Sequence, residues 1–174
     1  MIKVHDIKQF FEENVPKKTI TELSYDKANG IPLINSTEQS FDFDNIYIPE
    51  IVKDKIKTSD TIYFKDNKII FVEFKRGRKI PEQEFRLKAT ESILTFYNFI
   101  FSKDFKDNLC LPNNFFKIYF VYDKNNISST ALPTFRNTER KLRIQYKHLI
   151  SEYHIIESND FKNLFSITWK SYSN

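Results

Sequence analysis

The stretch that decides the fold is residues 58 to 75, which read Thr-Ser-Asp-Thr-Ile-Tyr-Phe-Lys-Asp-Asn-Lys-Ile-Ile-Phe-Val-Glu-Phe-Lys. Two runs of β-branched and aromatic residues, 61–64 and 69–74, flank a short polar segment that contains Asp66 and Asn67. Both of these residues tolerate the positive φ angles of a tight turn. The stretch therefore predicts a β-hairpin with Asp66 and Asn67 at its tip.

The position of the turn sets the register of the two strands. Counting outward from it, Phe64 faces Ile69, and at the far end Asp60 faces Glu73. Like charges directly opposite each other destabilise a sheet, so this register needs something that neutralises them, and a divalent cation is the obvious candidate. Lys75 lies two residues beyond Glu73 and shares its face by alternation. The hairpin thus predicts two carboxylates and an ammonium group at one end of one sheet face.

The segments on either side of the hairpin predict an α/β domain. Apolar residues at helical spacing predict one helix over residues 3–15 and a longer helix over residues 82–101. Alternating apolar residues over 41–48 predict a further strand. A nearly continuous apolar run over 115–122 predicts a central strand that is covered on both faces.

The C-terminal part predicts a basic helix and two short strands that close the sheet. The helix is expected to begin at Asn137 or Thr138 and to reach Ile150, and the strands to cover 153–156 and 165–169. Two hypotheses of equal weight explain the basic side chains of this helix. They contact a phosphate backbone, or they are simply exposed to solvent.

Composition narrows the kinds of site that the chain can hold. At 174 residues it is long enough for one domain with a real core, over residues 1–174. It has only two glycines, which excludes glycine-rich phosphate loops, and one cysteine, which excludes an intrachain disulfide. The three histidines are scattered and show no metal-ligand spacing. The net charge of +4 gives weak support for a polyanionic partner.

The sequence also bears on location. It has no apolar run long enough to span a membrane, and no apolar core of a signal peptide near its start. A single cysteine suits a reducing compartment. We therefore expect a cytoplasmic protein without a membrane partner.

The hairpin and the elements around it resemble the PD-(D/E)xK nuclease superfamily. The resemblance rests on Ser59 and Asp60 at the head of one strand and on Val-Glu-Phe-Lys at 72–75 in the next, followed by a helix and a buried strand. It covers residues 41–122, and Ser59 stands where the family often has proline. It implies a restriction-endonuclease-like αβββαβ core, that is, a mixed central sheet flanked by helices.

The resemblance also implies a Mg²⁺- or Mn²⁺-dependent phosphodiesterase. Asp60 and Glu73 would hold one or two of these ions together with the backbone carbonyl of Phe74, since hard cations prefer oxygen ligands. Lys75 would orient or deprotonate the attacking water and stabilise the charge that develops on the phosphate. The implied catalytic set is Asp60, Glu73 and Lys75.

Other residues are candidates for metal or substrate contact. Glu12 or Glu13, near the end of the first helix, would complete the metal site if that helix crosses the sheet end; otherwise they are surface glutamates. Asp42 and Asp44 share a face of their predicted strand and are reserve ligands. Basic and polar side chains after the hairpin and on the later helices are candidate nucleic-acid contacts: Arg76, Arg78, Lys79, Gln83, Arg86, Arg140 and Arg143.

The leading hypothesis is an endonuclease with a resolvase-like, repair, mobile-element or defence role, with DNA favoured over RNA as its substrate. One alternative is an RNA-cleaving endonuclease of the same superfamily. Others are a non-catalytic nucleic-acid-binding module that keeps the fold, and a nuclease subunit of a larger complex. Family resemblance also allows a homodimer. Taken alone, the charges of the hairpin fit equally well a surface salt bridge between Lys75 and one of the two acids.

Overall fold

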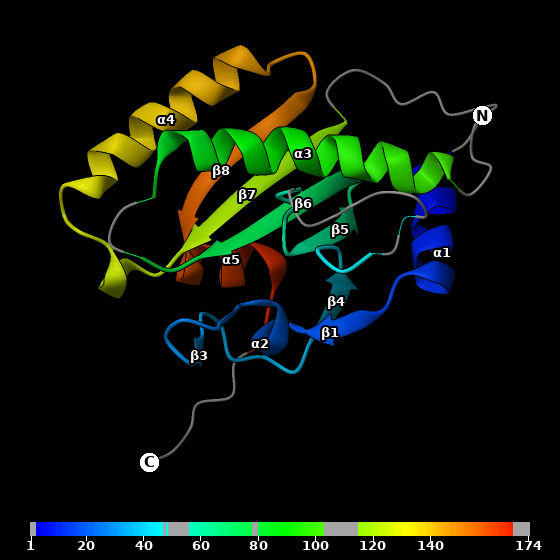
Figure 1. The fold of residues 1–174 in the computed structure, drawn as a ribbon, viewed down its shortest axis with the longest axis horizontal. Coiled ribbons are helices and arrows are strands. Elements are labelled where there is room, and N and C mark those ends of the chain that lie inside the picture. The colour runs from blue at the N-terminus through cyan, green and yellow to red at the C-terminus, as the bar shows by residue number, and fades with distance from the viewer. Residues whose placement is uncertain (1–2, 47, 49–55, 78–79, 103–114, 169–174) are drawn as a thin grey trace.

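The computed structural model describes residues 3–46, 48, 56–77, 80–102 and 115–168. In these residues a six-stranded mixed sheet has helices on both faces (Figure 1). The strands follow the order β1-β4-β5-β6-β7-β8 across the sheet. Their bounds are Lys17–Thr19 (β1), Gln39–Asp42 (β4), Thr61–Lys65 (β5), Lys68–Lys75 (β6), Phe116–Tyr122 (β7) and Ile150–Glu157 (β8). The α/β class expected from the sequence is therefore confirmed.

The helices divide between the two faces of the sheet. Those on one face are α1 (Val4–Asn14), α3 (Glu82–Phe101) and α4 (Ala131–Gln145). Those on the other face are α2 (Ile20–Leu23) and α5 (Ser158–Phe165). A separate two-stranded hairpin, β2 (Tyr25–Asp26) with β3 (Ile31–Pro32), follows α2. None of the helices in the described ranges is long and apolar enough to cross a membrane.

The predicted hairpin and its register are confirmed. Asp66 and Asn67 have φ angles of 51° and 56°, the left-handed values that the tight turn requires. The ladder pairs Phe64 with Ile69 and runs on to a last pair in which Thr61 faces Val72.

Strand alternation in β6 supplies both hydrophobic cores. Ile69 and Phe71 point to the face covered by α1, α3 and α4, where most of the phenylalanines pack. Ile70 and Val72 point to the opposite face and pack with Phe161 of α5. Because β6 contributes apolar side chains to both layers, it is a central strand, and its one acidic residue, Glu73, lies in the interior.

The strands after the hairpin are parallel. β7 pairs with β6 on one side and with β8 on the other, in parallel register on both. The central position predicted for residues 115–122 is therefore confirmed, and so are the helices expected at 3–15 and 82–101.

The α4 helix begins earlier than expected. It starts at Ala131 rather than at Asn137 or Thr138. Pro133 lies in the first turn, where a missing backbone N–H breaks no helical hydrogen bond, so the proline does not delimit the helix. The helix ends at Gln145, and Ile150, the expected end, opens β8.

Two predicted strands differ from the observed ones. The strand expected at 41–48 is β4, which ends at Asp42, because the chain turns at Asp44 and Asn45 and the N–H of Ile46 donates to the carbonyl of Phe43. The closing strand expected at 165–169 is absent from its described part: Phe165 ends α5, and Ser166 follows with a left-handed φ of 54°. The strand expected at 153–156 is longer, and it forms one edge of the sheet as β8.

Candidate functional site

Asp60 and Glu73 lie at the end of the hairpin ladder, on the face covered by α3. Thr61 and Val72 form the last ladder pair, so the next residues outward, Asp60 and Glu73, stand opposite each other. Each is two residues from a side chain packed in the α3 core, and alternation puts both carboxylates on that face. The opposition of the two acids deduced from the sequence is therefore present in the fold.

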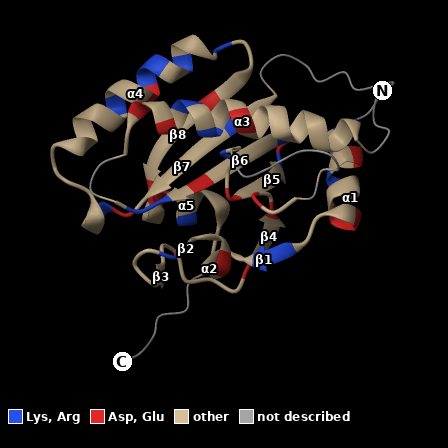
Figure 2. Ribbon diagram, in the orientation of Figure 1, with Lys and Arg blue, Asp and Glu red and all other residues tan. Residues whose placement is uncertain are grey.

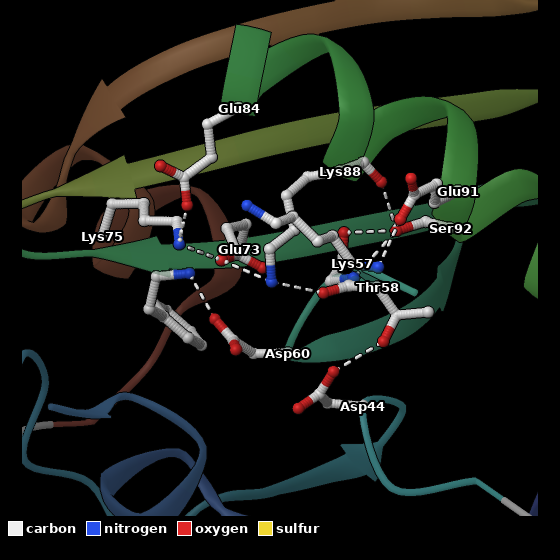
Figure 3. Close-up of polar contacts among 12 residues, drawn as sticks. Asp44, Lys57, Thr58, Asp60, Glu73, Lys75, Glu84, Lys88, Glu91 and Ser92 are labelled. Atoms are coloured by element: carbon white, nitrogen blue, oxygen red, sulfur yellow. Dashed lines mark hydrogen bonds and ion pairs between the residues drawn. The ribbon is translucent and has the colours of Figure 1, made fainter. Parts of the chain in front are cut away.

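Glu73 is a carboxylate held inside the protein. Its side chain is 1% exposed. One oxygen, Oε1, accepts from the Nζ of Lys75 at 2.9 Å and from the Nζ of Lys88 at 3.0 Å (Figure 3). The other oxygen, Oε2, is buried and has no hydrogen-bond partner among the described residues. One oxygen of this carboxylate therefore takes both lysine contacts, and the other has no partner among the described residues.

Asp60 is held by a backbone group of the neighbouring strand. Its Oδ2 accepts from the N–H of Phe74 at 2.6 Å. Burial and the negative charge of Glu73 raise the pKa of Asp60 well above its ordinary value, although nearby lysines oppose the shift. In the protein alone, the ionised form of this carboxyl is disfavoured, and a bound cation would favour it.

The two lysines are fixed by several acceptors each. Lys75 also binds Oε1 of Glu84 at 2.6 Å, and Lys88 donates to the carbonyl of Thr58 at 2.6 Å. Burial alone would lower the pKa of the Lys75 ammonium, but the carboxylates of Glu73 and Glu84 outweigh it and raise that pKa. Lys75 is therefore a cation near neutral pH, and it acts on a neighbour as a hydrogen-bond donor.

A polar line on α3 holds the chain that leads into β5. Glu84, Lys88 and Ser92 recur at spacing four, so they share one side of the helix. The hydroxyl of Ser92 accepts the N–H of Ser59 at 2.8 Å and lies 2.8 Å from the hydroxyl of Ser59. Ser59 is fully buried. The helix thus fixes the residue immediately before Asp60.

The sequence did not predict this line, and the α3 residues predicted to contact nucleic acid lie elsewhere on the helix. Gln83 and Arg86, named as nucleic-acid contacts, are exposed on α3. Thr90, four residues after Arg86 on the same helix, donates to carbonyls of its own helix. The signal that was available is three polar residues at spacing four within a helix that is otherwise buried on several sides.

The oxygen atoms at this end of the hairpin fit a hard divalent cation. Backbone N–H and C=O groups of one strand residue point to the same side, so the carbonyl of Phe74, like its N–H, lies toward Asp60. Together with Asp60 and Oε2 of Glu73 this makes a set of oxygen donors. Within the described part of the chain, no three His, Cys, Asp or Glu side chains gather closely enough to hold a metal ion among themselves. Water would complete the coordination, as is usual for Mg²⁺.

A hollow of about 240 Å³ opens onto these groups. One side consists of the hairpin end and α3, with Asp60, Glu73, Lys75 and Lys88. The other side is the β2–β3 hairpin and the end of α2, which the sequence analysis did not predict. Glu73 is buried and the two lysines are partly buried, and all of them line this hollow together with Asp60.

The basic residues after the hairpin are only partly described. Arg76 lies next to the hollow and pairs with Asp123 at 2.9 Å. Arg78 and Lys79 lie outside the described residues.

The basic residues of α4 have different surroundings. Lys and Arg recur along this helix (Figure 2), and Arg140 is exposed. Arg143 instead donates to the carbonyl of Tyr153 at 2.8 Å and pairs with Glu139, which accepts the N–H of Ile155 at 2.8 Å. These two side chains satisfy outward-facing backbone groups of the edge strand β8, so Arg143 has a structural task.

The structure does not bring the first helix to the site. Glu12 and Glu13 are exposed, and they bind Lys17 and Gln9 respectively. Helix α1 packs Phe11 against Phe64, near the tip of the hairpin and at the opposite end of β5 from Asp60.

The reserve ligands Asp42 and Asp44 also have partners of their own. Asp42 is 3% exposed and pairs with Lys18 at 2.6 Å, and it accepts from the amide of Asn45. Asp44 accepts the hydroxyl hydrogen bond of Thr58 at 2.6 Å. Asp44 therefore supports the segment before Asp60 rather than joining the two opposed acids.

Comparison of the chain with protein-family models, with curated proteins and with solved structures gave no match. What the site can do is therefore argued from its geometry and chemistry.

The Ser92 contact generates a first prediction. Ser92→Ala removes the acceptor of a buried N–H, which should lower the free energy of unfolding by about 1–3 kcal/mol. Thr90→Ala on the same helix is the matched control and should change it by less than about 0.5 kcal/mol. Urea unfolding followed by circular dichroism measures both. Equal stability of the two variants would show that Ser92 does not hold the segment before Asp60.

The raised pKa of Asp60 generates a second prediction. The folded chain keeps the Asp60 proton at pH values where the unfolded chain has lost it, so stability falls as pH rises from about 4 through the folded pKa. Asp60→Asn removes this cost and keeps an oxygen for the Phe74 N–H. Without divalent cations we expect it to be more stable than wild type at about pH 8, and as stable as wild type below about pH 4.

Unfolding in urea across this pH range, with EDTA present, tests the expectation. Glu13→Gln, an exposed acid-to-amide change, serves as the control and should leave the pH dependence unchanged. An Asp60→Asn protein that is less stable than wild type at about pH 8 would refute the electrostatic cost assigned to Asp60.

Proposed function

We propose that the protein is a Mg²⁺- or Mn²⁺-dependent nuclease that hydrolyses phosphodiester bonds, with DNA as the favoured substrate and internal cleavage favoured over cleavage from an end. One observation carries the proposal. Two carboxylates are forced opposite each other at the end of a sheet, one of them buried with an oxygen that has no partner among the described residues. This pair of carboxylates destabilises the protein when no ligand is bound, and it offers oxygen ligands to a divalent cation.

The donor set defines what each residue would do. Asp60, Oε2 of Glu73 and the carbonyl of Phe74 would hold the metal, which when bound neutralises phosphate charge and lowers the pKa of its water. Lys75 is kept protonated by Glu73 and Glu84. Its task is therefore to donate hydrogen bonds to the water or to a phosphate oxygen that gains charge.

Lys88 supplies a second ammonium from α3. It reaches the same oxygen of Glu73 as Lys75 does, but from α3 rather than from β6. Two cations on one carboxylate oxygen leave the other oxygen without a partner among the described residues, so it would be the one to bind a metal. This arrangement suits the stabilisation of a polyanionic transition state.

The order of elements supports the same proposal at the level of the fold. Helix α1, strands β4, β5 and β6, helix α3 and strand β7 follow the αβββαβ order of a restriction-endonuclease-like core. Between α1 and β4 the chain inserts β1, α2 and the β2–β3 hairpin. The α2 and β2–β3 part of this insertion forms the outer wall of the hollow. The segment that is additional to the αβββαβ order therefore lies where a substrate would enter.

A second candidate function has its own support. Lys75 and Lys88 already neutralise part of Glu73 without a metal, as a non-catalytic nucleic-acid-binding module would require. An RNA-cleaving enzyme and a nuclease subunit of a larger complex use the same site, and they differ from the main proposal in substrate and in partners.

Cleavage assays test the proposal. Plasmid, linear DNA and RNA are incubated with the protein and Mg²⁺ or Mn²⁺, and the products are resolved on gels. We expect cleavage that EDTA abolishes, and a loss of about 100-fold or more in Asp60→Asn, Glu73→Gln and Lys75→Met, because each removes a metal ligand or a transition-state donor. Lys8→Met on α1 should cleave as wild type does.

The outcomes separate the candidates. Nicked plasmid with intact linear ends supports internal cleavage. Binding of nucleic acid without cleavage in either metal supports the non-catalytic module. Undiminished cleavage in both Asp60→Asn and Lys75→Met would rule out this site as the catalytic one.

A further inference from the structure

A second hollow adjoins the candidate site at the C-terminal ends of β6 and β7. These strands are parallel, so the segments that follow them leave the sheet at the same end (Figure 1). The hollow measures about 570 Å³, a size that suits a small ligand. Neutral polar side chains dominate its lining: Asn29, Asn125, Asn126 and Ser128. This is where ligands commonly bind in open α/β sheets.

Arg76 connects the two hollows. It lines both of them, and its side chain is only 11% exposed. Its Nη2 binds Asp123 at 2.9 Å, whereas its buried Nε and Nη1 have no hydrogen-bond partner in the described ranges. A buried guanidinium with unpaired N–H groups is costly, and a ligand rich in acceptor oxygens would reduce the cost.

Asn125 offers a free amide on the far wall. Its backbone N–H is accepted by Asp123, which caps the short helical turn Lys124–Asn126. Its exposed side chain makes no hydrogen bond within the part of the chain that the structure describes. The backbone is therefore fixed while the amide stays available, and amides form paired hydrogen bonds with base edges.

Tyr25 stands on the near wall. It belongs to the β2–β3 hairpin, lines the hollow that holds Asp60 and Glu73, and is 49% exposed. The hairpin is stabilised at both ends, since Asp26 accepts the N–H groups of Ala28 and Asn29 and Ser24 binds Ile34. An exposed aromatic ring on a fixed support beside a phosphate site is a stacking platform for an unpaired base.

We propose that an unpaired nucleic-acid strand crosses both hollows. The inference rests on the proposed nuclease function: the scissile phosphate lies at Asp60 and Glu73, a base stacks on Tyr25, the neighbouring phosphate meets Arg76, and the next base enters the amide-lined hollow. Base edges are exposed in this way only when a nucleotide is unpaired. The substrate is then a single strand, or the unpaired part of a branched molecule, rather than continuous duplex.

Binding measurements test this without cleavage. Full-length Glu73→Gln protein is titrated into fluorescein-labelled 12-nucleotide single-stranded DNA, single-stranded RNA and blunt duplex DNA of about the same length, and fluorescence anisotropy is recorded. Tighter binding of either single strand than of the duplex supports the proposal. The single strand that binds more tightly identifies the substrate as DNA or RNA. If Glu73→Gln fails to fold, the wild-type chain in EDTA gives the same comparison.

Substitutions then localise the binding. On this background Asn125→Ala should weaken single-strand binding about fivefold, the value of one lost hydrogen bond. Tyr25→Ala should weaken it about tenfold, whereas Tyr25→Phe keeps the stacking face and should bind like the parent. Asn137→Ala on α4, which lines neither hollow, is the matched control and should have no effect.

Two results would overturn the inference. One is duplex binding as tight as single-strand binding, and the other is affinity unchanged by both Asn125→Ala and Tyr25→Ala. Either result leaves the nuclease proposal standing as long as wild-type protein cleaves with Mg²⁺ or Mn²⁺. The nuclease proposal is contradicted by a different result, namely cleavage that persists in both Asp60→Asn and Lys75→Met.

Discussion

The opposition of Asp60 and Glu73 is the constraint on which the rest of the site depends. It follows from a two-residue turn at Asp66 and Asn67, which fixes the register and leaves no freedom to slide the acids apart. Two buried like charges would be strongly destabilising if no opposite charge neutralised them. Two ammonium groups pair with Glu73, that of Lys75 on the same strand, β6, and that of Lys88 on helix α3.

Helix α3 does more than cover the sheet. Its apolar side chains pack on the core, while Glu84, Lys88 and Ser92 fix the ammonium of Lys75, the carboxylate of Glu73 and the chain before Asp60. The opposed acids therefore belong to a rigid frame, as a metal site or a transition-state site requires. The cost that remains, a raised pKa for Asp60 and an unpartnered oxygen of Glu73 within the described residues, is concentrated where a ligand would relieve it.

Local rules in the sequence explain how much could be predicted. Alternation and turn chemistry determine the hairpin register, and the apolar runs at 82–101 and 115–122 determine the α3 helix and the central strand. Lys88 could not be assigned in this way, because the rotation of a helix about its axis is set by packing when apolar residues lie on several sides. The same holds for the wall of the hollow. Its strands β2 and β3 are two residues long each, too short for a periodic signal.

The central claim is that a divalent cation binds between Asp60 and Glu73. A crystal of the protein soaked in Mn²⁺ tests it directly, through the anomalous difference map. The account predicts a peak between the two carboxylates, with ligand oxygens at about 2.0–2.3 Å, close to the carbonyl of Phe74. A map with no peak there, with Lys75 and Lys88 still paired to Glu73, would contradict it.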